Sequence, residues 1–522
     1  MKQETLKKAV RELIHHILYQ GSALTPKKLA ELKRKIAKKY NLDMLIRNSL
    51  ILEYASDEEK SYLKELLRVK KVRSVSGVVV IAVMIPPLPC PGECVYCPSS
   101  TTAPKSYTGK EPASLRAQMF EFDAFKQVSA RLKQLEAIGH ETDKVEVIVM
   151  GGTFLAQSLK FQYDFIKGIY DALNEHKAKT LEEAIKLNET AKHRCVGLTI
   201  ETRPDYAQKR HIDLMLKYGA TRVELGVQVL NDRVLKKIKR GHSLKDVVES
   251  THLLKDSAYK LAYHIMPGFQ TFEQDVKMFK RMFSDQRFRP DMLKIYPVLV
   301  IEGTELYEWW KAGIYKPLSN EEAAELIAEA YRYIPEWVRV MRVQRDIPAN
   351  VIDAGVTKSN LREYVEKVMK EKGIPCREIR CREAGHKWIK EGLLPKNLTF
   401  VKRRYKASWG TEYFLSYEDV EQDILVGYLR ARIPDKPYRP ELNSKTLLVR
   451  ELKVVGMSLP LHVRKKVSFQ HKGIGKELMQ KAEELAYDKK MEKVAVISAV
   501  GTREYYRKLG YELLGPYMVK DL

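Results

Sequence analysis

The stretch GVVVIAVMIPPLPCPGECVYCPSS (77–100) joins an apolar run to a loop rich in proline, glycine and cysteine. The run 77–84 is the first of six short β-rich segments that alternate with long amphipathic stretches. The other five are VEVIVM (145–150), CVGLTI (195–200), RVELGVQ (222–228), KLAYHIM (260–266) and MLKIYP (292–297). Apolar strands separated by helices are typical of a parallel sheet covered by helices. The pattern therefore predicts an α/β fold with a partial barrel of six strand–helix units.

Polar residues follow several of these segments at their carboxyl ends, where barrel enzymes place their chemistry. They are Gly151–Thr153, Glu201–Arg203, Gln228, His264 and Lys294. For His264, contact with a substrate and a satisfied core histidine are equally open interpretations.

Three of the six cysteines, Cys90, Cys94 and Cys97, lie within eight residues. Six cysteines are too few for a disulfide framework in a chain of 522 residues. Thiolates are the usual ligands of iron–sulfur clusters. Three of them leave one metal position open, as catalytic zinc sites do. A structural zinc site is the alternative, and it is disfavoured because no fourth Cys or His lies nearby in the sequence.

The other cysteines carry weaker signals. Cys195 opens a β-rich segment and is expected in the core. Cys376 and Cys381 could bind zinc together with His386, but a good fourth ligand is lacking. Buried or surface thiols are therefore the favoured interpretation for this pair.

The net charge is +25, from 92 Lys and Arg against 67 Asp and Glu. Such an excess favours a polyanionic partner, nucleic acid above an anionic membrane, although a solvated basic surface is the alternative. No run of about 18 apolar residues predicts a membrane span. The start MKQETLKKAVRELI lacks the apolar region of a secretory signal, so a cytoplasmic location is the default.

Basic residues gather in two regions. Residues 1–40 contain 11 Lys or Arg and 3 Asp or Glu. In LTPKKLAELKRKIAKKYNL (24–42), Thr25 and Pro26 predict a helix start, and Leu29, Leu32 and Ile36 form an apolar stripe. An exposed helix packed on a neighbour and a contact with RNA phosphates both remain open. The second region, 386–406, contains Lys387, Trp388, Lys390, Lys402, Arg403, Arg404, Tyr405 and Lys406.

The last 125 residues suggest a compact mixed α/β unit (398–522). RELKVVG (450–456) predicts a strand, QHKGIG (470–475) a glycine loop and KELMQKAEELAYDKK (476–490) a helix. Backbone N–H groups at such a helix start form a ready anion site. The segment VAVISAVGTREYYRKLGYELLG (494–515) then predicts a strand, a helix with Tyr505 and Tyr506, and a last strand.

These motifs resemble two known families. The Cys-x3-Cys-x2-Cys spacing, with Tyr96 before the third cysteine, resembles the radical S-adenosylmethionine (SAM) enzymes, and MGGT (150–153) resembles their SAM-binding glycine motif. The loop at 470–475 resembles the pyrophosphate loop of GNAT acetyltransferases. Both together resemble the catalytic subunit of Elongator, through segments that include SYTGKEP (106–112), LTIETRPDY (198–206), RGHSLKDVVES (240–250) and GPYMVKDL (515–522).

The resemblance implies four regions: a basic helical tRNA-binding region (1–72), a radical SAM partial barrel (73–300), an extension and linker (301–397) and a GNAT domain (398–522). It implies a [4Fe-4S] cluster on Cys90, Cys94 and Cys97, and SAM at Gly151, Gly152 and Thr153. It implies acetyl-CoA at Lys144, Glu451, Leu452, Lys453, Val454, Gln470, Gly473, Ile474 and Gly475, with Tyr505 or Tyr506 acting on CoA. Lys294 would face SAM or uridine.

The implied activity is the modification of tRNA wobble uridine at C5. A radical made from SAM would take hydrogen from the methyl group of acetyl-CoA, and the carbon radical would add to uridine. Thioester hydrolysis would leave a carboxymethyl group. The implied partners are the tRNA anticodon stem-loop and an external electron donor. The short gap of three residues between Cys90 and Cys94 resembles prokaryotic or archaeal forms, which would act without other Elongator subunits.

Three rival functions stay open at this point. The first is a protein lysine acetyltransferase with a non-catalytic barrel, which the complete cysteine set disfavours. The second is a non-catalytic RNA-binding scaffold. The third is a radical SAM RNA methylase or methylthiotransferase, which the glycine loop at 470–475 disfavours.

Overall fold

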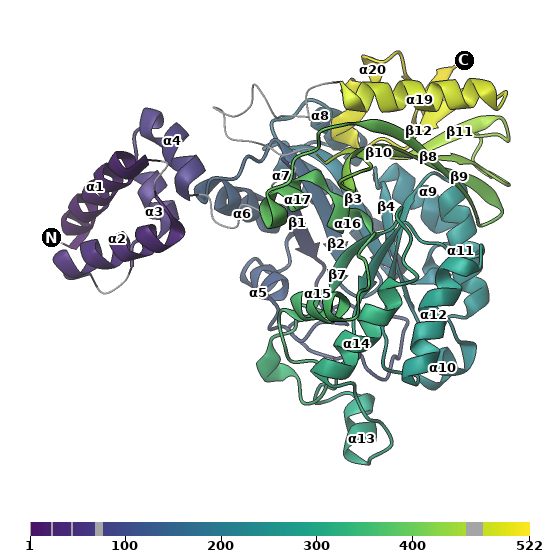
Figure 1. Cartoon of the computed structure of the whole chain (residues 1–522), viewed down its shortest axis with the longest axis horizontal. Helices are drawn as coiled ribbons and strands as arrows, with labels where there is room; N and C mark the ends of the chain where they lie inside the picture. Colours follow the sequence, from purple (N-terminus) through teal and green to yellow (C-terminus); the bar gives the residue numbers. More distant parts are fainter. Residues whose placement is uncertain (1, 22–23, 43–44, 68–76, 456–472) are drawn as a thin grey trace.

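The computed structural model describes residues 2–21, 24–42, 45–67, 77–455 and 473–522. Four helices form an N-terminal lobe that stands apart from the main body in Figure 1: α1 (Lys2–Gln20), α2 (Pro26–Lys39), α3 (Asn48–Glu53) and α4 (Asp57–Leu67). Helix α2 begins as predicted, because the Thr25 side chain accepts a hydrogen bond from Lys28 N at 3.2 Å. Its Ile36 is buried in the lobe's own core with Leu13 and Ile51.

Seven parallel strands form the main sheet, in chain order. They are β1 (Val79–Met84), β2 (Lys144–Met150), β3 (Arg194–Thr202), β4 (Arg222–Gln228), β5 (Lys260–Ile265), β6 (Met292–Ile295) and β7 (Arg339–Val343). The prediction of an α/β partial barrel is confirmed, with all six expected strands. The seventh strand, β7, is missing from the prediction because its arginines interrupt the apolar pattern at the open edge of the sheet.

Helices cover one face of this sheet (Figure 1). They are α5 (Pro112–Met119), α6 (Ala124–Ala137), α7 (Leu159–Leu173), α8 (Leu181–Asn188), α9 (Lys209–Lys217), α10 (Asp232–Lys237), α11 (Leu244–Asp256), α12 (Phe272–Ser284), α14 (Asn320–Tyr331) and α15 (Leu361–Glu371), whereas α13 (Glu305–Lys311) lies away from the sheet at the lower end of Figure 1. Successive strand residues face opposite sides. Val145, Val147 and Val149 therefore pack in the core with these helices, whereas Glu146 faces the inner side and pairs with Arg222.

A second, mixed sheet forms the C-terminal unit, in the order β13-β14-β12-β11-β10-β9-β8. Its strands are β8 (Thr399–Ala407), β9 (Gly410–Asp419), β10 (Ile424–Ile433), β11 (Thr446–Val454), β12 (Lys493–Val496), β13 (Glu512–Leu514) and β14 (Tyr517–Asp521). Helices α19 (Ile474–Asp488) and α20 (Arg503–Arg507) belong to this unit, and α16 (Ile379–Arg382) and α17 (Ala384–Glu391) lead into it.

The second sheet covers the amino ends of the barrel strands. Gly501 lies against Arg194 and Cys195 at the start of β3. A fully buried set of charges also joins the barrel to the second sheet, and we call it the interface cluster. Its members are Lys255, Asp256 and Asp291 of the barrel and Glu412, Arg432 and Arg450 of the second sheet. Arg450 Nη1 lies 2.8 Å from Asp291 Oδ2, and Arg432 Nε lies 2.7 Å from Asp256 Oδ1. The carboxyl ends of the strands, at the opposite side, stay uncovered by this sheet.

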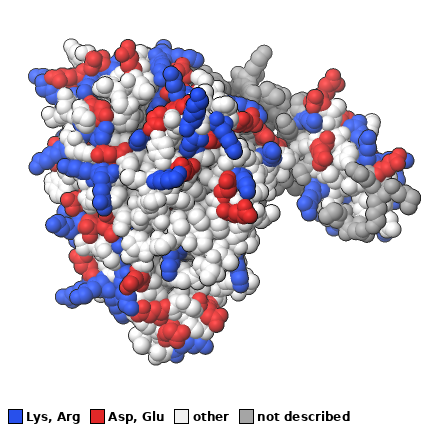
Figure 2. Space-filling model, turned by 180° about the vertical axis from the view of Figure 1, so that it is seen from behind, with Lys and Arg blue, Asp and Glu red and all other residues white. Residues whose placement is uncertain are grey.

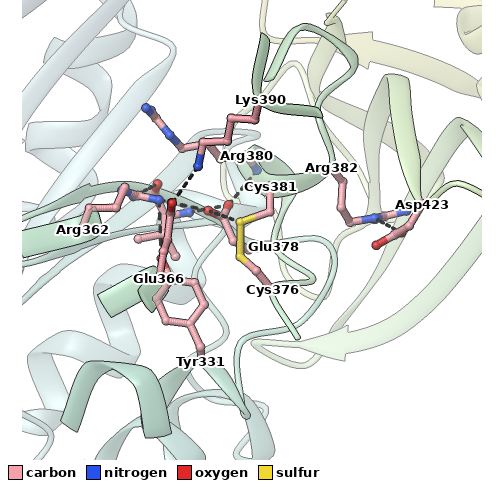
Figure 3. Close-up of a disulfide and its surroundings, with 11 residues drawn as sticks. Tyr331, Arg362, Glu366, Cys376, Glu378, Arg380, Cys381, Arg382, Lys390 and Asp423 are labelled. Atoms are coloured by element: carbon pink, nitrogen blue, oxygen red, sulfur yellow. Dashed lines mark hydrogen bonds and ion pairs between the residues drawn. A yellow bond between two sulfur atoms is a disulfide. The ribbon is translucent and has the colours of Figure 1, made fainter. Parts of the chain in front are cut away.

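A disulfide joins Cys376, which precedes α16, to Cys381 within α16 (Figure 3). The favoured prediction of free thiols is therefore wrong, and sulfur atoms bonded to each other are not zinc ligands; His386 lies beside Glu383 instead. The enclosed Glu378 accepts hydrogen bonds from Val340 N of β7 and from Arg380 N. Spacing alone does not distinguish a disulfide from two thiols, so the sequence does not show this link.

The helices of the described residues include none that is both long and apolar enough to cross a bilayer.

Candidate active site

One pocket opens at the carboxyl ends of the barrel strands, and the three clustered cysteines line it. They lie on the loop that follows β1, and all three thiols are free and partly buried. Cys90 Sγ lies 3.5 Å from Thr153 Oγ1, Cys97 Sγ accepts a hydrogen bond from Ser106 N at 3.2 Å, and Arg240 donates to Cys94 Sγ at 3.4 Å. The structure thus brings the three predicted cysteines to one pocket.

The chemistry of this set fits an iron–sulfur cluster with one open iron. Burial and the neighbouring Cys94 raise the pKa of Cys97, so the thiolate needs a cation beside it. Iron provides that charge, and metal binding displaces thiol protons. Within the described residues the fourth free cysteine, Cys195, is buried in β3 and does not line the pocket. Three protein ligands are thus what the pocket offers.

The glycine motif lies beside the cysteines, at the end of β2. Gly151 and Gly152 have φ values of 111° and 54°, which side chains rarely adopt. A Cβ on Gly151 would lie 2.9 Å from Pro104 and 3.0 Å from Ile85. Gly152 and Thr153, which lies against Cys90, line the pocket, whereas Gly151 packs beside Pro104 and Ile85 and allows the tight turn behind them.

Four polar side chains from neighbouring strands meet at the floor of the pocket, and we call them the pocket cluster: Glu201 of β3, Glu224 of β4, His264 of β5 and Lys294 of β6. Lys294 Nζ lies 3.0 Å from Glu201 Oε1 and also pairs with Glu224. His264 Nε2 lies 2.7 Å from Glu224 Oε2. The carboxylates and His264 line the pocket, whereas Lys294 lies behind them. Lys294 thus occupies the position between the carboxylates that a metal cation would take.

Charge pairing outweighs burial in this cluster. Burial disfavours the Lys294 ammonium, but Glu224, Tyr296 and Glu201 raise its pKa well above the usual value. Burial likewise disfavours the Glu224 carboxylate, but Lys294 and His264 hold its pKa well below the usual value. Both groups are therefore ionised.

The second predicted site, in the C-terminal unit, is partly described. Gly473 has a φ of 85° and caps α19, which begins at Ile474, two residues before the predicted helix 476–490. Gln470 lies outside the described residues. Strand β11 pairs with β12 only over Thr446–Val449, while β10 pairs on the other side with Glu451–Val454. Among the described residues, one backbone edge of Glu451, Leu452, Lys453 and Val454 therefore has no strand partner.

The two adjacent tyrosines of α20 differ clearly in their exposure to solvent. Tyr505 is 39% exposed, and its hydroxyl would lie 3.0 Å from a Cβ on Gly475, at the start of α19. Tyr506 is only 6% exposed and packs in the core against Tyr511. The structure thus brings Tyr505, and not Tyr506, to the glycine loop.

Lys144 lies at the amino end of β2, the end that faces the second sheet. Its ammonium lies 3.4 Å from Asp143 and is about half exposed. Lys144 and Glu146 share the inner side of the barrel, and Lys453 of β11 is one of the charges that hold down the pKa of Glu146, against its burial. Lys144 is thus far along β2 from Gly151, on the side of the C-terminal unit.

Sequence reasoning placed Arg203 at the carboxyl end of a strand, but it missed three other arginines that line the pocket, Arg240, Arg342 and Arg345. Arg203 and Arg240 are less than a tenth exposed, and one terminal nitrogen of Arg203 has no hydrogen-bond partner in the structure. A signal for Arg240 was present, because it opens the quoted segment RGHSLKDVVES (240–250).

Comparisons with known proteins agree with this architecture. Residues 6–75 match the ELP3 N-terminal domain, 84–282 the Radical SAM superfamily, 290–371 the Radical_SAM C-terminal domain and 461–521 the acetyltransferase (GNAT) domain. The chain is 51% identical over 533 residues to the tRNA uridine(34) acetyltransferase of Methanocaldococcus infernus, covering 100% of both. It is 45% identical to Elongator complex protein 3 of Homo sapiens, over 95% of this chain and 93% of that protein.

A solved structure is also similar. Archaeal Methanocaldococcus infernus Elp3 with an N-terminal deletion (1–46) superposes with a TM-score of 0.78 at 51% identity, over 86% of this chain and 100% of that one. With a radical SAM barrel, a GNAT domain and relatives of this similarity over its whole length, the chain belongs to the family of Elongator complex protein 3 and the archaeal tRNA uridine(34) acetyltransferases.

Proposed function

We propose that this protein modifies the wobble uridine of tRNA at C5, forming carboxymethyluridine from acetyl-CoA. The observation that carries the proposal is a pocket with three free cysteines in the same chain as a glycine-capped helix suited to CoA. The relatives' name, tRNA uridine(34) acetyltransferase, supports the substrate.

Cys90, Cys94 and Cys97 would hold a [4Fe-4S] cluster, and Gly151, Gly152 and Thr153 would hold the amino group of SAM. When bound, these groups supply a 5′-deoxyadenosyl radical able to take hydrogen from the acetyl methyl group. The chain's own residues do the rest. Arg240 balances thiolate charge through Cys94, and Lys294 positions the pocket carboxylates Glu201 and Glu224 rather than touching the substrate itself.

Acetyl-CoA would bind the C-terminal unit. The backbone N–H groups of Gly473, Ile474 and Gly475, together with Gln470, would hold the pyrophosphate at the start of α19. The unpaired edge of Glu451, Leu452, Lys453 and Val454 would pair with the pantetheine amides. Tyr505 is the tyrosine we propose to contact CoA, because Tyr506 is buried in the core. Lys144, at the barrel end that faces this unit, would contact the acyl-CoA.

The tRNA would contact exposed basic residues. Arg34, Lys35 and Lys38 are exposed on α2, whereas Lys33 is partly buried and hydrogen-bonds Asn48. Lys402, Arg404 and Lys406 face outward on β8. Two members of the predicted 386–406 contact are structural instead, since Arg403 pairs with Glu418 and Tyr405 stacks on Trp337. Elsewhere, Lys and Arg alternate with acidic residues over the face shown in Figure 2.

The proposal has further parts. The division into 1–72, 73–300, 301–397 and 398–522 would separate tRNA binding, radical chemistry, a linking region and acetyl-CoA binding. An external donor would supply the electron, and no other Elongator subunit would be needed. The proposed place of action is the cytoplasm.

The test is mass spectrometry of tRNA nucleosides after anaerobic reaction with SAM, acetyl-CoA and a reductant. A wobble uridine that gains a carboxymethyl group supports the proposal, and unchanged uridine refutes it. The same reaction with a lysine-rich peptide in place of tRNA examines the rival protein lysine acetyltransferase, in which the barrel would be idle. The pocket of three free cysteines speaks against that rival.

A further inference from the structure

The pocket cluster contains a histidine whose environment fits more than substrate contact. His264 Nε2 faces the buried Glu224 carboxylate at 2.7 Å, and the ring packs edge-on against Tyr296 at 5.5 Å. Its other ring nitrogen, Nδ1, has no hydrogen-bond partner among the described residues. His264 also lines the pocket that holds the three cysteines. The ring is thus fixed by two neighbours, with one nitrogen left for a third.

Under the proposed function, one more bond must break in this pocket. The acetyl methyl carbon reacts beside the cysteines, and the thioester carbonyl carbon is bonded directly to it. The carbonyl therefore stays in the pocket once uridine carries the acyl-CoA group. Release of CoA requires water to attack that carbonyl, and such an attack is faster when a base takes the proton of the water.

We propose that His264 is the general base for this hydrolysis, with Glu224 as its positioning residue; the inference rests on the proposed function. Nε2–H donates to Glu224, which leaves the Nδ1 lone pair to accept a proton from water. The water oxygen bonds to the carbonyl carbon, the C–S bond breaks, and His264 returns the proton to the thiolate of CoA. Water and thioester thus become carboxylic acid and CoA thiol, with no oxidant or reductant.

The carboxylates named below and the lysine behind the pocket are already engaged. Lys294 pairs with both Glu201 and Glu224. Glu111 accepts hydrogen bonds from Thr108 N and Gly109 N. His264 is the one histidine among the described residues that line the pocket. A group that combines access, a fixed ring and a free lone pair is what general-base catalysis needs.

The experiment isolates hydrolysis from radical chemistry. The probe is an anticodon stem-loop RNA whose wobble uridine already carries a 5-CH2–CO–S–CoA group. It is mixed with full-length protein that holds its cluster but receives no SAM, and released CoA is measured. We expect His264→Gln to slow release by about 100-fold or more. His252→Gln is the matched control, since His252 Nε2 also lies close to a buried carboxylate, 3.1 Å from Asp256 Oδ2, but outside the pocket, and it should leave release unchanged.

The complete reaction gives the second readout. With SAM, acetyl-CoA and tRNA, His264→Gln should still form 5′-deoxyadenosine at the wild-type level, while CoA stays covalently attached to the tRNA by mass. Added imidazole should restore hydrolysis in His264→Ala.

Wild-type release of CoA from the probe by His264→Gln would overturn the assignment, and so would a loss of 5′-deoxyadenosine formation. If wild-type protein hydrolyses the probe but never makes the adduct from acetyl-CoA, the proposed function fails while the hydrolytic role of His264 stands.

Discussion

The two buried ion clusters lie at opposite ends of the same barrel strands, and each places a lysine between two carboxylates. In the pocket cluster, Lys294 pairs with Glu201 and Glu224, and its pKa is raised well above the usual value. In the interface cluster, Lys255 lies 3.3 Å from Asp291 and 3.5 Å from Glu412, yet burial and Arg450 lower its pKa to about 8. The same local arrangement thus has opposite outcomes.

The difference comes from what else shares the carboxylates. In the interface cluster, Arg450 and Arg432 compete for them, and all the charges are closed off from solvent. In the pocket cluster carboxylates predominate, and they face a cavity. Charge and burial alone therefore do not mark a reactive site, whereas access to a cavity and an incomplete set of partners do.

A substitution at the pocket end of the barrel should reduce activity rather than stability. Cys94→Ala removes one of three cluster ligands, and we expect it to abolish reductive SAM cleavage, measured as 5′-deoxyadenosine, while tRNA affinity is retained. Cys195→Ala is the control, because Cys195 is free but buried in β3 outside the pocket. Normal SAM cleavage by Cys94→Ala would remove the cluster assignment.

A substitution in the interface cluster should reduce the stability of the fold. Asp291→Ala leaves Arg450 and Lys255 buried without their partner, and we expect a loss of about 3–5 kcal/mol in unfolding free energy. Glu201→Ala, at the other end, removes a partly exposed carboxylate and should cost far less. Thermal unfolding of the two variants checks the contrast, and equal shifts in Tm would erase the distinction between the clusters.

The pH dependence of the unfolding free energy should reflect the lowered pKa of Lys255. Because its pKa is lower in the folded protein than in the unfolded chain, the unfolded state binds more protons above pH 8. Its contribution to stability should therefore rise between about pH 8 and pH 10, by roughly 2 kcal/mol. Thermal unfolding of the wild type relative to Lys255→Met over this range measures it. A difference that does not change with pH contradicts the assigned pKa shift.

Of the two tyrosines of α20, Tyr505 lies at the proposed site and Tyr506 lies in the core. Tyr505→Phe removes a hydroxyl beside Gly475, and we expect tRNA-dependent acetyl-CoA turnover to fall by about tenfold, with a larger effect on kcat than on KM. Tyr506→Phe should leave turnover near the wild-type level. A larger loss from Tyr506→Phe reverses the assignment.

The smallest expected effect concerns the N-terminal lobe. Arg34→Glu, Lys35→Glu and Lys38→Glu together should weaken tRNA binding and reduce the steepness of its salt dependence. Lys33→Met should leave that slope unchanged, because Lys33 is turned toward Asn48. Binding measured at several salt concentrations distinguishes the two, and an unaltered slope in the triple variant excludes α2 as a phosphate contact.

Local patterns predicted much of this molecule. Apolar periodicity located six barrel strands, the Thr25–Pro26 pair located a helix start, and cysteine spacing located the pocket. What failed depends on contacts between distant segments. The β7 arginines concealed a strand, and strand alternation on β8 turned Arg403 and Tyr405 inward. The link between Cys376 and Cys381 depends on how the chain folds around Glu378.

Within the site, the sequence showed which residues carry chemistry but not their partners. Lys294 was expected to face a substrate, yet it lies behind Glu201 and Glu224. The contact of Arg240 with Cys94 spans 146 residues of sequence, so no local pattern could show it. The pocket cluster forms because four neighbouring strands place these residues side by side: Glu201 is in register with Glu224, and His264 is in register with Lys294.

The interface cluster also bears on how the chain is made. Arg450, the partner of Asp291, follows it by 159 residues. At a translation rate of about 5–20 residues per second, a barrel emerging from the ribosome holds Asp291 without that partner for roughly 10–30 s. During this interval the amino ends of the strands lack their cover, so the nascent barrel is a client for chaperones until the C-terminal unit arrives. Synonymous codon changes between these two positions, which alter the rate of translation, should therefore change the yield of folded protein.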